Sequence, residues 1–263
     1  MHHKRIITAL IVLPLVYLYV MYLPLKYVLF LLVAFSTLAL AEYYAMSGVD
    51  GLMRFAGLGF GIVLLSVHFF RGRGYWPDIL LLAIMVIAGI RLFSRRETAG
   101  SIMDVGYTVL GLVYIPGLLS FQVELLRCGP RFIILLYASV WAADSAAYYI
   151  GKGMGKRKLY PEVSPNKTIE GAVGSVIGGG LGALLVRTVL MGQIPVWRAV
   201  LLGLAVGIVT IVGDLVESMF KRDAGAKDSG GIIPGHGGIL DKLDGALFAG
   251  PVFYWMALTM RIL

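Results

Sequence analysis

The chain has 263 residues, of which 59% are hydrophobic and only 14% are charged, and its mean hydropathy is +0.84. An ordinary soluble domain has about 25% charged residues, so the composition excludes a soluble globular protein and predicts a polytopic membrane protein. The formal net charge of +8 does not indicate a nucleic-acid partner, because excess Lys and Arg in a membrane protein more often reflect orientation and anionic lipid headgroups.

Long apolar runs predict an all-α fold of about nine transmembrane helices. The runs cover approximately residues 6–23, 25–45, 55–70, 79–93, 105–123, 131–150, 171–191, 198–216 and 246–262. The third and fourth runs are short enough to be re-entrant or broken segments. Removing both of them leaves the sidedness of every other loop unchanged.

The distribution of basic residues predicts the orientation of these helices. Loops on the same side as the N-terminus hold 15 of the 23 Lys and Arg residues, and loops on the other side hold 8. The positive-inside rule therefore predicts a cytoplasmic N-terminus in the cell membrane. The polar loops 151–170 and 217–245 then lie on the cytoplasmic side, where nucleotides are available.

Glycine spacing predicts close helix packing in two of the runs. Small residues let helix backbones approach each other in lipid, where association has no hydrophobic drive. Gly174, Gly178 and Gly182 recur every four residues on one helix face of one run, and Gly57, Gly59 and Gly61 in another run are interpreted in the same way.

Acidic residues concentrate between residues 214 and 244, a polar segment between two apolar runs. Six of the 15 carboxylates lie there, alternating with basic side chains, and this composition suits a hard cation and phosphate groups. Asp241 and Asp244 are three residues apart, so on a helix they would share a face and could share a cation; for Asp241 alone, helix capping is an equal alternative. Asp214 and Glu217 repeat the spacing at the end of the eighth run, where an acid opposes the helix dipole.

A glycine-rich stretch at residues 234–238 lies between these acids. Its glycines permit a left-handed backbone that turns successive amides toward an anion, although a plain flexible loop is an equal alternative. His236 is interpreted as a hydrogen-bonding partner of substrate more readily than as a general base.

Two further features lie before residue 172. The stretch Ser164–Gly171 reads as a helix entry at Thr168 and Glu170, with Lys167 projecting toward the acids. Asp144 lies inside an apolar run, where an ionisable group costs several kcal/mol unless it is paired, so it indicates a polar cavity or a metal.

At these residues the sequence resembles the phosphatidate cytidylyltransferase (CDP-diacylglycerol synthase) family. The matching positions of the family signature, within residues 218–244, are Ser218, Lys221, Arg222, Lys227, Asp228, Gly230, Ile233, Pro234, His236, Gly237, Gly238, Ile239, Asp241 and Asp244. Lys242 stands where the family usually has arginine, which keeps the charge but loses bidentate phosphate geometry. The resemblance covers roughly the C-terminal half, from Trp141 onward, whereas the first 130 residues match only as apolar spans.

The resemblance implies magnesium-dependent transfer of a cytidylyl group from CTP to phosphatidic acid, and it also suggests a homodimer. The expected magnesium ligands are Asp241 and Asp244, with Asp214 and Asp228 as candidates for a second cation. The residues expected to be catalytic are Asp241, Asp244, Lys227 and Asp228. Those expected to bind substrate are Lys167, Ser218, Lys221, Arg222, His236, Gly237, Gly238 and Lys242, and Asp144 and Glu217 are further candidates.

The expected organisation is an N-terminal membrane region, residues 1–130, used for packing and lipid access, and a C-terminal catalytic region, residues 131–263. Membrane lipids would surround both regions. Two other functions compete with cytidylyl transfer. A membrane prenyl transferase would also bind a diphosphate through aspartates and magnesium, and an ion-coupled transporter would account for Asp144 and the glycine-rich helices.

Overall fold

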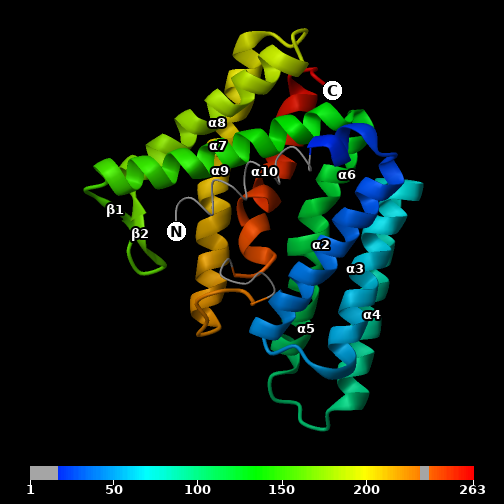
Figure 1. The fold of residues 1–263 in the computed structure, drawn as a ribbon. Helices are drawn as coiled ribbons and strands as arrows, with labels where there is room; N and C mark the ends of the chain where they lie inside the picture. Colours follow the sequence, from blue (N-terminus) through cyan, green and yellow to red (C-terminus); the bar gives the residue numbers. More distant parts are fainter. Residues whose placement is uncertain (1–16, 232–236) are drawn as a thin grey trace.

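The structure is a computed structural model that describes residues 17–231 and 237–263 (Figure 1). Helices make up almost all of it, and the all-α prediction is confirmed. The helices are α2 (Leu25–Met46), α3 (Gly51–Arg71), α4 (Trp76–Ser94), α5 (Ser101–Leu112), α6 (Leu118–Cys128), α7 (Pro130–Met154), α8 (Ile169–Leu190), α9 (Val196–Asp223) and α10 (Leu240–Thr259). Short 3₁₀ and π-helical turns, η1 (Arg73–Tyr75) and η2 (Val113–Gly117), precede α4 and join α5 to α6.

Seven helical segments in the described residues are long and apolar enough to cross a membrane. They correspond to the second through eighth apolar runs, with α5, η2 and α6 forming one segment, Ser101–Cys128. The third and fourth runs are full-length helices, because η1 extends α4 to a segment of 22 residues and α3 has 21. The last run corresponds to α10, whereas most of the first run, residues 6–23, lies outside the described residues.

The helices form two sets that α10 joins. Helices α2 to α6 lie side by side, while α7 and α8 cross Figure 1 at a steep angle to them, and α9 and α10 lie between the two sets. Buried side chains form one apolar cluster among α2–α6 and a second one among α6–α9. Helix α10 contributes Leu243 to the first cluster and Phe253 to the second.

The polar loop between α7 and α8 holds the only strands among the described residues, β1 (Lys158–Tyr160) and β2 (Ser164–Thr168), paired antiparallel. The expected helix entry is confirmed, because Thr168 is the N-cap of α8 and its hydroxyl accepts a hydrogen bond from the Gly171 amide at 3.1 Å. Lys167 is therefore held on a strand that leads directly into a capped helix.

Glycines bring α7 and α8 together as predicted. A Cβ at Gly178 would lie 2.5 Å from the Ala142 carbonyl oxygen, and one at Gly182 would lie 2.6 Å from the Ala138 carbonyl oxygen. In α3, Gly57 and Gly61 likewise pack against α2 side chains, but Gly59 has open space around it, so the packing prediction is wrong for Gly59.

Gly178→Ala is expected to destabilise the protein by roughly 1–3 kcal/mol, because the added methyl has no room against the α7 backbone. Its melting temperature in detergent should fall. The matched control is Gly59→Ala, which fills open space in a helix and should leave the melting temperature unchanged or raise it. Equal effects of the two substitutions would contradict the close-packing account.

Candidate active site

Three carboxylates converge where α9 lies beside the first turns of α10. One oxygen from each of Asp214, Glu217 and Asp244 lies within 4.8 Å of the others. The helices approach closely at this level, because a Cβ at Gly213 would lie 2.5 Å from the Asp244 carbonyl oxygen. Because Gly213 has no side chain, α9 can approach α10 closely enough for acids from both helices to form one group.

Two lysines lie against this acidic group. Lys167 Nζ, from β2, lies 2.6 Å from Asp214 Oδ2. Lys221 Nζ, from the last turn of α9, lies 2.9 Å from Glu217 Oε2 and 2.6 Å from Asp241 Oδ1. The lysines offset the repulsion that three neighbouring carboxylates would otherwise exert on one another.

Asp241 has different partners from Asp244. Its Oδ2 accepts hydrogen bonds from the Gly238 amide at 2.8 Å and from the Ser229 amide and hydroxyl at 3.0 and 2.9 Å. Burial alone would raise the pKa of the Asp241 carboxyl, but these bonds and Lys221 lower it to about 2, so it is ionised at neutral pH. That Asp241 and Asp244 share one cation stays a prediction.

Asp214 and Glu217 do not lie at a helix end. Helix α9 continues to Asp223, so the expectation that they oppose the dipole of a C-terminal turn is wrong. Both carboxylates instead have side-chain partners: Lys167 and Ser218 for Asp214, and Lys221 for Glu217. Ser218, which is buried, donates to Asp214 Oδ1 at 3.3 Å.

The other predicted site residues have fewer hydrogen bonds and ion pairs than Lys167, Lys221 and Asp241. Arg222 donates to the carbonyl oxygens of Val163 and Ala226, which ties the β-hairpin and the following loop to the end of α9. Lys227, Asp228 and Lys242 are exposed. Gly237 has a φ of +82°, a left-handed conformation that favours glycine. His236 lies outside the described residues, as do Ile233 and Pro234.

Asp144 is exposed on α7 and lies close enough to Asp214, Lys167 and Lys242 for their charges to act on it. The charge of Asp144 in turn acts on Asp244, as do those of Asp214 and Glu217. The intramembrane acid that the sequence singled out therefore belongs to the surroundings of the acidic group.

Sequence reasoning missed two residues of the N-terminal region. Glu42, in α2, accepts hydrogen bonds from the amides of Ile239 and Leu240 at 3.0 and 2.8 Å. Tyr114, in the π-helical turn η2, lies within electrostatic range of Glu217 and Asp244. An ionisable residue in an apolar run was the available signal for Glu42, as it was for Asp144; Tyr114 had no such signal.

The acidic group suits a divalent cation. Magnesium takes oxygen ligands, and the group offers carboxylate oxygens from three residues. Glu217 Oε1 is buried and has no hydrogen-bond partner among the described residues, so one oxygen is free to bind a ligand. Asp214, Glu217 and Asp244 could therefore hold the metal.

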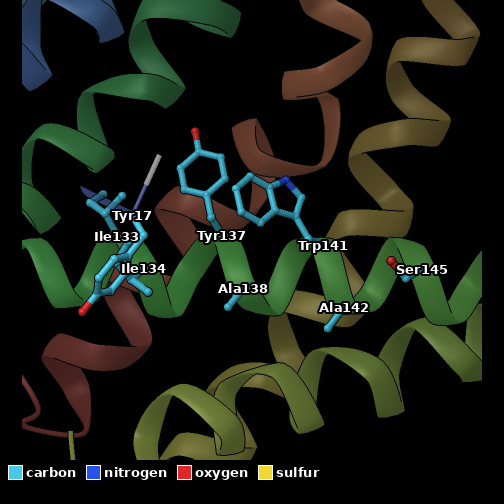
Figure 2. Close-up of a pocket in the computed structure, with 8 residues that line it drawn as sticks. All are labelled: Tyr17, Ile133, Ile134, Tyr137, Ala138, Trp141, Ala142 and Ser145. Carbon is cyan, nitrogen blue, oxygen red and sulfur yellow. The ribbon is translucent and has the colours of Figure 1, made fainter. Parts of the chain in front are cut away.

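A groove of about 380 Å³ runs along α7, and its described lining includes none of the three clustered acids (Figure 2). Tyr137 and Trp141 line it, together with Tyr17, Ile133, Ile134, Ala138, Ala142 and Ser145. None of these described lining residues is charged. The described part of its lining therefore offers no charged group to a triphosphate.

Comparisons with known proteins show which family the chain belongs to. The profile of the cytidylyltransferase family matches residues 3–260. The chain is 34% identical to a phosphatidate cytidylyltransferase of Bacillus subtilis, over 86% of this chain and 87% of the relative. It is 33% identical to one of Staphylococcus aureus over 84% of each chain, and 48% identical to one of Synechocystis over 49% of this chain and 44% of the relative. The chain therefore belongs to the cytidylyltransferase family.

Proposed function

We propose that the protein transfers a cytidylyl group from CTP to phosphatidic acid, producing CDP-diacylglycerol and pyrophosphate for phospholipid synthesis. The observation that carries the proposal is the convergence of Asp214, Glu217 and Asp244 beside Lys167, between the C-terminal half of α9 and the first turns of α10. A lipid substrate and a water-soluble triphosphate must meet where apolar helices end in polar groups, and this chain belongs to a family of cytidylyltransferases.

The reaction needs little proton transfer. A phosphate monoester has a second pKa near 6, so a phosphatidic acid oxygen can attack the α-phosphorus of CTP without a general base. A new P–O bond forms, the bond from the α-phosphorus to the bridging oxygen breaks, and pyrophosphate leaves. Catalysis then consists of positioning and of neutralising charge.

The basic residues divide into two groups by their contacts. Lys167 borders the acidic group on its half-exposed side, and Arg222, Lys227 and Lys242 are exposed nearby, so we assign them to the phosphates. Lys221 is buried and paired with Glu217 and Asp241, so we assign it to orienting those carboxylates, and its predicted phosphate contact stays a prediction.

Magnesium bound at the acidic group would offset the negative charge of the triphosphate. Asp214, Glu217 and Asp244 would hold it, and Asp241 would fix the first turn of α10 that presents Asp244. Asp228 remains a candidate ligand of a second cation.

We place the acidic group on the cytoplasmic side of the cell membrane. The basis is the excess of Lys and Arg on that side, as the positive-inside rule requires. In Figure 1 the loops after α2, α4 and α9 lie at one end of the molecule, as this orientation requires. A homodimer stays a prediction that rests on the family resemblance.

Family membership does not support the two competing functions. The prenyl transferase and the ion-coupled transporter both explained isolated acids in apolar runs. Neither explains a signature in which acids, lysines and glycines meet at one end of two helices.

The purified protein is expected to incorporate labelled CMP into lipid only when CTP, phosphatidic acid and magnesium are all present. Omitting each component in turn should abolish incorporation. Incorporation with a prenyl acceptor, or none with phosphatidic acid, would contradict the proposed function.

Asp244→Asn is expected to lower CMP incorporation by more than roughly 100-fold, because it removes a proposed metal ligand, and Asp241→Asn by about 10- to 100-fold, the usual cost of losing an outer partner of a metal site. Both variants should remain folded in detergent. The matched control, Asp223→Asn, changes an exposed acid at the end of α9 and should retain wild-type turnover. Near-normal turnover of Asp244→Asn would defeat the ligand assignment.

Lys242→Arg is expected to be tolerated or mildly activating in the same assay. Arginine keeps the charge of this exposed side chain and adds a planar donor pair that suits phosphate. An inactive variant would show that the lysine has a role of its own.

A further inference from the structure

Glu42 is a buried carboxylate far from the signature in sequence but in contact with it in space. It lies in α2, in the N-terminal region, and its residue is 5% exposed. Its Oε1 accepts from the Ile239 amide at 3.0 Å, and its Oε2 accepts from the Leu240 amide at 2.8 Å. The Ser229 hydroxyl lies 3.2 Å from the same Oε2.

These amides begin α10, where a helix has unpaired N–H groups and a partial positive charge. An N-cap side chain usually satisfies them, but the N-cap residue here, Ile239, has none that can accept a hydrogen bond. Glu42 supplies the missing acceptor from another helix. The start of α10 is thus fixed by a residue almost 200 positions earlier in the chain.

The signature makes room for this carboxylate. A Cβ at Gly238 would overlap Glu42 Oε2, and one at Gly230 would overlap Glu42 Oε1. Neither glycine has a positive φ, so left-handed backbone does not account for them. Close approach to Glu42 does.

Hydrogen bonds continue from Glu42 to the acidic group. The Ser229 hydroxyl lies 3.2 Å from Glu42 Oε2 and 2.9 Å from Asp241 Oδ2, so its single proton can be donated to either carboxylate, one at a time. Asp241 contacts Lys221, which contacts Glu217. The network therefore runs from Glu42 in α2 to Glu217 in the acidic group, and each side chain in it helps to orient the next one.

We propose that Glu42 is a positioning residue for the transfer reaction, holding Ser229 and the first turn of α10 so that Asp241 and Asp244 take their working places. The inference rests on the proposed function. It assigns the N-terminal helices a part in the reaction beyond packing: they hold the catalytic segment in register with α9.

The test variant is Glu42→Gln, which keeps the shape but replaces one of the two accepting oxygens with an NH₂ group, so either the Ile239 or the Leu240 amide must face another donor. We expect kcat to fall by roughly 10- to 100-fold, as for loss of an outer partner of a metal site. The KM for phosphatidic acid should change by less than about threefold, because Glu42 lies behind the site. An unchanged kcat would overturn the proposal.

Hydrogen exchange gives a second readout that needs no activity. In the wild type the Ile239 and Leu240 amides should be protected, and in Glu42→Gln they should exchange faster while the middle of α10 is unchanged. If the variant fails to fold, the wild-type measurement still tests the proposal. Exchange of the wild-type Ile239 and Leu240 amides at the rate of an unprotected peptide would refute it. An inactive wild type with protected amides would refute the proposed function and leave the capping role standing.

Two further variants separate positioning from general stability. Tyr44→Phe removes a buried hydrogen bond from the same helix, to the Thr108 carbonyl oxygen at 2.9 Å, and should lower the melting temperature without lowering kcat. Ser229→Ala should lower kcat, and combining it with Glu42→Gln should cost less than the product of the single effects, because both act through one network. Multiplied effects, or a kcat loss in Tyr44→Phe equal to that in Glu42→Gln, would contradict positioning.

Discussion

Holding several carboxylates together where two apolar helices meet is the constraint on which the rest of this structure depends. Like charges a few ångströms apart repel strongly, and burial increases the cost of each charge. The molecule offsets this cost with Lys167 and Lys221, and a divalent cation between Asp214, Glu217 and Asp244 would offset more of it. The same arrangement of acids and lysines suits the charge of a triphosphate.

Close backbone packing makes this arrangement geometrically possible. Gly213 lets α9 approach α10 at the level of the acids, and Gly178 and Gly182 bring α8 against α7. Since β2 leads directly into α8, the position of Lys167 depends on that packing as well. Small residues at helix contacts therefore act on the chemistry indirectly, by setting where charged side chains meet.

Much of the fold and part of the site could be predicted from sequence, because apolar runs and residue spacing are local properties. The apolar runs predicted α2 to α9. Thr168 was predicted to begin α8, and glycine spacing predicted the contacts of Gly178 and Gly182. The signature identified the segment that holds Asp241 and Asp244. Gly59 was mispredicted because spacing does not reveal which face of a helix meets a neighbour. The β-hairpin was not predicted because its few residues carry no repeating pattern.

The sequence by itself determined a membrane-embedded helical protein and the residue types of a phosphate and cation site. Only the tertiary structure decided which acids meet: Glu217 joins Asp214 and Asp244, whereas Asp241 turns toward Ser229 and Lys221. Only the tertiary structure also brought Glu42 to the start of α10. Helical spacing fixes neighbours along one helix, but contacts between helices depend on how their surfaces pack, and no short stretch of sequence encodes that packing.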